Sequence, residues 1–283
     1  MIDSTTNLEE LCYTFQTIER ALGFPSATIF AFHGLPLSDD ILHMLGRCSH
    51  RIVIFVDVTA FFHVFPYGFT PTPGVDYDKQ RTEHFIVSDM WEIPHLEAHD
   101  VILRISDSTC LTMNNYDLPD FPTFLPDEFT KSKIAYQTQS VPNNFVVGHK
   151  YINNLLDATL LFMDANHIEP KNPEMWNLVM NYKKGMNSMP KLNNSFEIVR
   201  KEFMQRREVR AYHNYITNMT AEQFYNNNWS SDVLRFLTMA IFGGPEETYI
   251  MHVSGFIEKD FLKGRKYEGV CRLGRFGTAP TIE

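Results

Sequence analysis

The 283-residue sequence has few cysteines and no C-x-x-C pair. Its four cysteines stand at positions 12, 48, 110 and 271, and this spacing excludes a zinc ribbon and a thioredoxin-like site. Two interpretations of the cysteines stay open. They are either buried free thiols, because free cysteine is often buried, or cross-links that form later in an oxidised particle.

Positive net charge and long apolar runs are also absent. The formal net charge is −9 at pH 7, whereas a sequence-independent nucleic-acid binder needs a basic surface. No stretch reaches the roughly 18 consecutive apolar residues that span a bilayer. The polar and acidic start, residues 1–4, is not that of a signal peptide. We therefore expect no nucleic-acid partner, no membrane span and synthesis in a reducing compartment.

Motifs of catalysis and cofactor binding are missing as well. The sequence contains no G-x-S-x-G, no Walker loop and no G-x-G-x-x-G. His95 and His99 are four residues apart, but the preceding Pro94 favours a turn over a helix face that could chelate a metal. The histidines and cysteine within residues 43–50 lack a fourth ligand at a suitable spacing. We predict no catalytic residue, no metal site, no cofactor and no enzyme.

Hydrophobic periodicity predicts many strands and several helices. The expected strands are Ala27–His33, Arg51–Val58, Ala60–Phe65, His84–Ser88, Asp100–Ser106, Lys133–Gln139, Asn144–Gly148, Leu234–Phe242 and Thr248–Phe261. The expected helices are Leu8–Leu22, Ser38–Gly46, Tyr151–Ala165, Pro173–Lys184, Ser195–Arg207 and Ala221–Asn228. This mixture favours a β-rich α+β fold. Three prolines at positions 119, 122 and 126 mark the one candidate domain boundary.

A series of short motifs follows that boundary in a fixed order. It begins with V-V-G-x-K at 146–150 and F-M at 162–163, and it continues with H-x-x-x-T-N at 213–218 and E-Q-F at 222–224. The residues concerned are Val146, Val147, Gly148, Lys150, Phe162, Met163, Glu174, His213, Thr217, Asn218, Glu222, Gln223, Phe224 and Trp229. In order and spacing the series resembles the baculovirus polyhedrin/granulin family. The resemblance covers Lys133–Phe261 and suggests a divergent nudivirus occlusion-body protein.

The resemblance implies a jelly-roll-like antiparallel β-sandwich core with helical extensions. Residues 1–126 would form an N-terminal α/β extension, and residues 127–283 a polyhedrin-like region, or the chain would form a single domain overall. The implied function is that of a structural matrix protein. Such a protein self-assembles into a crystal lattice that embeds and protects virions and dissolves at alkaline pH.

The expected partners are further copies of the chain and the embedded virions, and the expected location is a viral occlusion body assembled in the host-cell nucleus. Cys271 in the C-terminal tail and Cys12 near the other end are the expected intermolecular disulfide. Two other functions stay open. One is a soluble viral interaction protein that binds a host factor, and the other is a metal-dependent enzyme that uses the histidine-rich N-terminal half.

Overall fold

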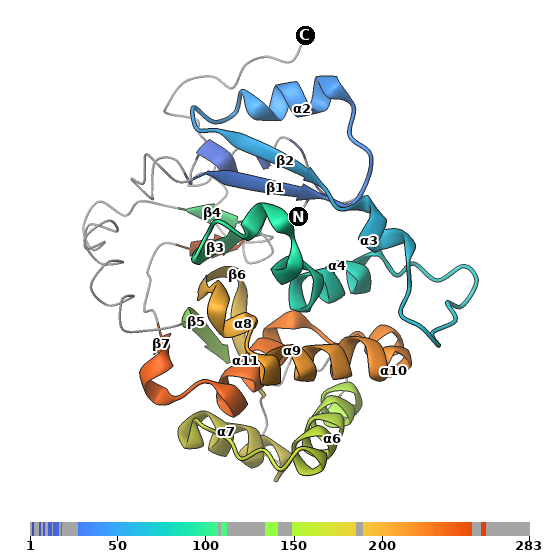
Figure 1. The fold of residues 1–283 in the computed structure, drawn as a ribbon, viewed down its shortest axis with the longest axis vertical. Coiled ribbons are helices and arrows are strands. Elements are labelled where there is room, and N and C mark those ends of the chain that lie inside the picture. The colour runs from blue at the N-terminus through green and yellow to red at the C-terminus, as the bar shows by residue number, and fades with distance from the viewer. Residues whose placement is uncertain are drawn as a thin grey trace. The chain divides into compact units, whose positions relative to one another are not determined.

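The computed structural model describes residues 28–106, 109–111, 134–140, 149–184, 189–250 and 256–258, together with 2, 6, 8, 11, 12, 14–16 and 18. The chain divides into two compact units, each made from segments that are far apart in the sequence (Figure 1). Unit 1 comprises Met1–Ala60, Ile105–Asp127 and His252–Glu283, and unit 2 comprises Phe61–Arg104 and Glu128–Met251. The division into residues 1–126 and 127–283 as folding regions stays a prediction.

Unit 1 contains a parallel pair of strands joined through a helix. Strands β1 (Ile29–His33) and β2 (Val53–Asp57) pair in register from Ile29↔Val53 to His33↔Asp57. Both are rich in β-branched and aromatic residues, which suit a pleated, half-buried surface. Helix α2 (Asp39–Gly46) connects them, because parallel neighbours need a crossover connection. The Ser38 hydroxyl accepts a hydrogen bond from the backbone N–H of Ile41 and so caps this helix.

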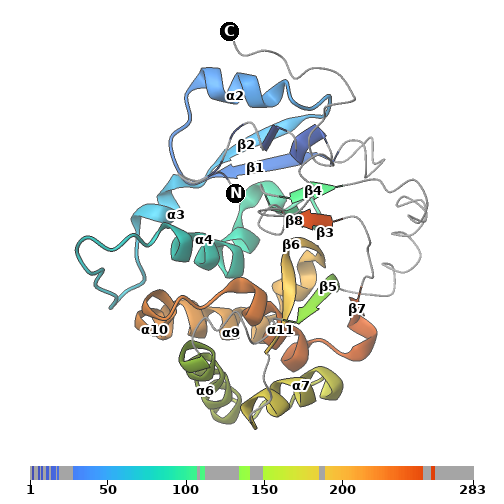
Figure 2. The same ribbon diagram turned by 180° about the vertical axis from the view of Figure 1, so that it is seen from behind.

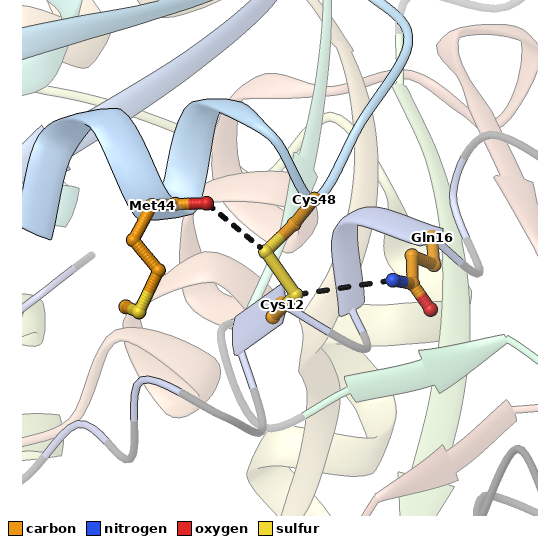
Figure 3. Close-up of a disulfide and its surroundings, with 4 residues drawn as sticks. All are labelled: Cys12, Gln16, Met44 and Cys48. Carbon is orange, nitrogen blue, oxygen red and sulfur yellow. Dashed lines mark hydrogen bonds between the residues drawn. A yellow bond between two sulfur atoms is a disulfide. The ribbon is translucent and has the colours of Figure 1, made fainter. Parts of the chain in front are cut away.

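A β-bridge, a strand pair and a disulfide also lie in the described part of unit 1. Ile2 forms a parallel bridge with His33, beside β1. Strands β4 (Thr109–Leu111) and β8 (Phe256–Glu258) pair antiparallel. A disulfide joins Cys12 to Cys48, just beyond α2, with the two Cα atoms 5.2 Å apart (Figure 3). The side-chain amide of Gln16 lies 3.9 Å from the Cys12 sulfur.

Unit 2 is built around a four-stranded sheet in the order β3-β6-β5-β7. Strand β5 pairs antiparallel with β6 and parallel with β7. The strands are β3 (Val101–Ile105), β5 (Ile134–Ser140), β6 (Pro190–Arg200) and β7 (Thr248–Ile250). The sheet is therefore mixed in direction and small.

Helices make up most of the described part of unit 2 (Figures 1 and 2). After α3 (Thr59–His63), which crosses from unit 1, these are α4 (Asp78–Val87), η1 (Asp89–Glu92), η2 (Pro94–Leu96), α6 (His149–Ala165), α7 (Pro173–Lys183), α8 (Lys201–Met204), α9 (Arg207–Asn214), the π-helix η3 (Tyr215–Met219), α10 (Ala221–Asn226), α11 (Ser231–Phe242) and η4 (Pro245–Glu247). Among the described helices, none has both the length and the apolar character needed to pass through a bilayer.

Helix α11 is the centre of unit 2, and all 12 of its residues are buried. It packs against β6 and contacts α4, α7 and α9. Its C-terminal carbonyl groups are used as well, since the backbone N–H groups of Lys171 and Asn172 donate to Ile241 and Ala240. A helix that is covered on every side carries apolar residues all round rather than on one stripe. Any charged side chain on α11 must therefore find its partners inside the protein.

The expected jelly-roll-like β-sandwich is wrong. The described residues form a parallel pair, a mixed four-stranded sheet and an antiparallel pair, accompanied by many helices, whereas a jelly roll consists of long antiparallel strands. The expected strands Ala60–Phe65, His84–Ser88 and Leu234–Phe242 lie largely in α3, α4 and α11. Short apolar runs show too few residues for a period that separates a strand from a helix, which explains these errors.

Other expected elements are confirmed. Helices Tyr151–Ala165 and Pro173–Lys184 correspond to α6 and α7, and strand Arg51–Val58 contains β2. The expected helix Ser195–Arg207 is partly wrong, because residues 195–200 continue strand β6 before α8 begins. The expected strand Asn144–Gly148 lies outside the described residues.

Candidate functional site

A carboxylate lies in the apolar interior of unit 2. Glu197 belongs to β6 and is 1% exposed, beside Ile198 and Val199, which are equally buried. An ionised carboxylate that is removed from water is costly unless opposite charges and hydrogen bonds replace the water. The chain provides both from two other elements, β3 and α11.

Two guanidinium groups bind this carboxylate. Arg104 of β3 donates from Nε to Glu197 Oε1 at 2.6 Å. Arg235 of α11 donates from Nε to Oε2 at 3.1 Å, and its Nη2 lies 3.5 Å from Oε1. The side chains of Arg104, Glu197 and Arg235 are 12%, 1% and 4% exposed. These three residues are called the Glu197 cluster below.

The surroundings of Arg235 fix its guanidinium and keep a histidine neutral. Its Nη1 lies 3.0 Å from the sulfur of Met204, and its Cζ lies 5.3 Å from the centroid of the Trp91 ring. His213 Nε2 lies 2.9 Å from the hydroxyl of Thr238 on α11. Burial, followed by the positive charge of Arg235, lowers the pKa of His213 to about 3. His213 therefore adds no positive charge near neutral pH.

A second charged group joins the same strand and helix. Lys191 of β6 has its Nζ 2.8 Å from Asp232 Oδ2 at the start of α11. Glu83 of α4 accepts a hydrogen bond from the backbone N–H of Ser231 at 2.7 Å. Burial, followed by the negative charge of Asp232, raises the pKa of Glu83 above its ordinary 4.5. Glu83, Lys191 and Asp232 are called the Asp232 cluster below, and they hold the first turn of α11.

A third polar group connects α4 to α10. His84 Nδ1 lies 2.8 Å from the hydroxyl of Tyr225, and His84 Nε2 lies 3.9 Å from Asp89 Oδ2. Burial lowers the pKa of His84 to about 4, while burial and then Glu92 raise the pKa of Asp89 to about 6. Burial also raises the pKa of Tyr225. These shifts favour neutral His84 and neutral Tyr225, so the group acts as a hydrogen-bonded link within unit 2.

Among the described residues, those singled out by sequence motifs do not form one site. Val146, Val147 and Gly148 lie outside the described residues, and Lys150 lies in α6. A buried set packs in the core: Phe162, Met163, His213, Thr217, Phe224 and Trp229. Another set is at least partly exposed on α7, η3 and α10: Glu174, Asn218, Glu222 and Gln223. The motif order thus reflects positions in helices of unit 2 rather than a shared surface.

The structure also places the cysteine and histidine candidates. Cys12 is bonded to Cys48 within the chain, so in this structure its sulfur is not available to Cys271, which lies outside the described residues. The same disulfide uses the sulfur of Cys48, the cysteine that lies between the histidines at positions 43 and 50. His95 is exposed in η2, a single turn. Within the described ranges, no group of three or more His, Cys, Asp or Glu could hold a metal ion.

Sequence reasoning missed the residues of both clusters. Glu197 fell at the start of an expected helix, and Arg235 fell inside an expected apolar strand. A signal was present for Arg235, since it is a single charged residue inside the largely apolar run 233–242, whereas Glu197 is followed within five residues by three further charged residues at 200–202. Charged residues are almost never fully buried unless they are paired. An isolated charge in such a run therefore indicates a buried ion pair.

Solved structures of known proteins share this fold, although no family model and no curated protein matches the sequence. Core-mannan synthase A (CmsA/Ktr4) from Aspergillus fumigatus, in its Mn/GDP form, aligns with a TM-score of 0.71 and 15% identity, over 88% of this chain and 71% of that chain. The mannosyltransferase Ktr4p from S. cerevisiae aligns in its complex with GDP with a TM-score of 0.69 and 14% identity, over 88% and 67% of the two chains.

The chain has the fold of these mannosyltransferases. A second structure of Ktr4p gives the same result, with a TM-score of 0.67 and 15% identity over the same shares of the two chains. At such low identity the likeness establishes the fold and leaves the activity to be tested.

This fold overturns the family resemblance. Membership of the polyhedrin/granulin family is wrong, because the likeness to mannosyltransferases extends over 88% of the chain, whereas the motif series consisted of short pieces. The expectation of a non-enzymatic matrix protein of occlusion bodies is contradicted by the same finding. The expected partners, further copies and embedded virions, belonged to that role and have no support in the structure. Assembly in a host nucleus is not tested by the structure.

Proposed function

We propose that this protein is a glycosyltransferase that takes a sugar from a nucleoside diphosphate sugar. The observation that carries the proposal is the fold, which aligns over 88% of the chain with the GDP form of core-mannan synthase A. The two structures of a second mannosyltransferase support the same assignment. The donor to try first is GDP-mannose, since it is the sugar nucleotide that leaves GDP when mannose is transferred.

The reaction places defined demands on the protein. The bond between C1 of the sugar and the diphosphate oxygen breaks, and the diphosphate leaves with the electron pair. A bond forms between C1 and an acceptor hydroxyl oxygen, whose proton passes to the leaving diphosphate or to water. Positive charge develops on the sugar ring in such a transition state, and carboxylates stabilise that charge. The leaving group needs positive charge or hydrogen-bond donors around its phosphates.

The Glu197 cluster contains the positively charged donors that a leaving diphosphate needs. Glu197 is 1% exposed and both of its oxygens are bound, so we assign it the role of holding the guanidinium groups of Arg104 and Arg235 in position, at 2.6 Å and 3.1 Å. A preorganised charge is more effective than one that must reorient during the reaction. The described residues do not offer a group of His, Cys, Asp or Glu side chains that could hold a metal ion.

The test is a transfer assay with matched variants. Purified protein is incubated with GDP-mannose and with other nucleotide sugars, with and without Mn²⁺, and release of the nucleoside diphosphate is measured. We expect release that depends on the protein and falls at least 100-fold in Glu197→Gln, since one preorganised electrostatic contact contributes 10²–10³-fold in other enzymes. Glu174→Gln, an exposed glutamate on α7, is the control and should retain full activity.

Two results would decide against the proposal. Absence of both binding and turnover across the whole set of nucleotide sugars would overturn the glycosyltransferase assignment. Full activity of a folded Glu197→Gln variant would leave the transferase in place and remove Glu197 from its mechanism. Thermal melting of each variant separates lost activity from lost folding.

A further inference from the structure

Arg104 has donor groups that the structure leaves available. Its Nε is used, because it donates to Glu197 Oε1 at 2.6 Å. Within the described part of the chain, its two terminal nitrogens, Nη1 and Nη2, have no hydrogen-bond or ion-pair partner. Arg235 differs, since its Nη1 and Nη2 both have neighbours, the sulfur of Met204 and the carboxylate of Glu197.

The guanidinium of Arg104 is both fixed and accessible. The short contact with Glu197, itself 1% exposed, holds the plane of the group from one side. The Arg104 side chain is 12% exposed, so it is the member of the cluster that a ligand can reach most easily. Donors that are already oriented lose less freedom when a ligand binds, and this raises affinity.

The chemistry of the group selects the class of ligand. Arginine stays protonated in proteins, and its planar fork matches phosphate and carboxylate oxygens with two parallel hydrogen bonds. Two terminal nitrogens without partners in the described part of the chain, beside a carboxylate that is already bound, can bind an additional anion with at least two acceptor oxygens. A phosphate group meets this requirement.

We propose that Arg104 binds a phosphate group through Nη1 and Nη2, and that this group belongs to the diphosphate of a nucleotide. The identity of the nucleotide rests on the glycosyltransferase function proposed above, whereas binding of phosphate by Arg104 does not. One guanidinium then holds Glu197 through Nε and the leaving group through its terminal nitrogens. The carboxylate and the diphosphate then lie at two edges of the same planar guanidinium group, and Glu197 acts as the positioning residue for Arg104.

The experiment compares three probes by calorimetry: GDP, guanosine and inorganic pyrophosphate. The wild type, Arg104→Ala and Arg104→Lys are measured, with Arg210→Ala as the matched control. Arg210 lies in the same unit and pairs with Glu92 at 3.0 Å, with both side chains about half exposed. We expect Arg104→Ala to weaken GDP and pyrophosphate binding at least tenfold and to leave guanosine binding unchanged. Arg104→Lys keeps the charge without the fork, so it should weaken both several-fold.

Each outcome decides between the two proposals. Binding of GDP and pyrophosphate that Arg104→Ala and Arg104→Lys leave unchanged would overturn the phosphate site and leave the glycosyltransferase proposal standing. Pyrophosphate binding that is lost in Arg104→Ala, in a protein that does not bind GDP, would support the site as one for free phosphate and count against the nucleotide. Failure of the wild type to bind any phosphate-containing probe would overturn the Arg104 proposal. If Arg104→Ala does not fold, the Arg104→Lys variant decides.

Discussion

The two charged clusters of unit 2 join the same strand to the same helix with opposite polarity. In the Glu197 cluster the carboxylate lies on β6 and the cation, Arg235, lies on α11. In the Asp232 cluster the cation, Lys191, lies on β6 and the carboxylate lies on α11. Asp232 and Arg235 are about one helical turn apart. A third residue from another element joins each pair, Arg104 in one case and Glu83 in the other.

The third residue changes the charge balance in opposite directions in the two clusters. Glu83 brings a second carboxyl group near Asp232, and the repulsion is relieved because Glu83 takes up a proton more readily, as its raised pKa indicates. Arg104 brings a second guanidinium to Glu197, and a guanidinium cannot lose its proton at any ordinary pH. A second carboxyl group in a cluster can therefore be neutralised by protonation. A second arginine remains a cation, and it can bind an anion. We therefore interpret the Asp232 cluster as structural and the Glu197 cluster as one that binds an anion.

Removal of Glu197 should have the largest effect on stability. Glu197→Ala leaves two guanidinium groups without the carboxylate between them, and breaking a buried ion pair in this way costs about 3–5 kcal/mol. Denaturant unfolding measures the change in the free energy of unfolding. Glu174→Ala, an exposed position on α7, should change it by less than about 0.5 kcal/mol. Similar stability of the two variants would show that the Glu197 cluster contributes nothing to folding.

Acid should unfold the protein through His213. Its pKa is lowered from 6.5 to about 3 in the folded state, so the folded protein favours the neutral ring. The stability this provides is fully present above pH 6.5 and is lost as the pH falls from 6.5 toward 3. By pH ~4 the loss should reach about 3 kcal/mol. His213→Gln should flatten this part of the stability–pH curve, and an equally steep curve in the variant would assign the loss to other groups.

Glu83 should show the opposite pH dependence. Because its folded-state pKa is raised above 4.5, its contribution is present below that pH and is lost as the pH rises through the folded-state pKa. Glu83→Gln keeps an oxygen that can accept from the Ser231 N–H but cannot ionise. The variant should gain stability relative to the wild type as the pH rises above 4.5 and through the folded-state pKa. Thermal melting across that range would refute the assignment if the two proteins differ by a constant amount.

The smallest effect is expected at Lys191. Its side chain is 31% exposed, so water and salt screen its pairing with Asp232. Lys191→Met should cost about 0.5–1 kcal/mol, and the cost should shrink at high salt. A loss as large as that of Glu197→Ala would mean that exposure does not distinguish the two clusters, and the comparison between them would fail.

Local signals predicted some elements of unit 2 and not others. Helices α6 and α7 were predicted with nearly correct bounds because each shows a helical period, and in the structure the side chain of Asn172 caps the start of α7. Helix α11 was predicted as a strand because its second half, residues 236–242, is apolar apart from Thr238 and too short to show a clear period, although Asp232, Arg235 and Thr238 recur at a helical spacing. Its helical form is decided by the elements that surround it.

The candidate site could not be predicted from single motifs for a related reason. Arg104, Glu197 and Arg235 come from three separate parts of the sequence, and only the packing of α11 on β6 brings two of them together. The motif series that suggested a lattice protein includes six residues that pack in the core, Phe162 and Trp229 among them. Apolar residues at similar spacing recur in unrelated folds, because many helices bury one side in the same way.

The Cys12–Cys48 disulfide has a consequence for limited proteolysis. It turns the intervening segment, with a sequence separation of 36 and with β1 and α2 inside it, into a covalent ring. A single cut within this ring opens it without releasing a fragment, so the nicked chain migrates as one species on a non-reducing gel. Only reduction separates the N-terminal piece from the rest. A nicking site inside the ring is therefore visible only when digests are compared with and without a reducing agent.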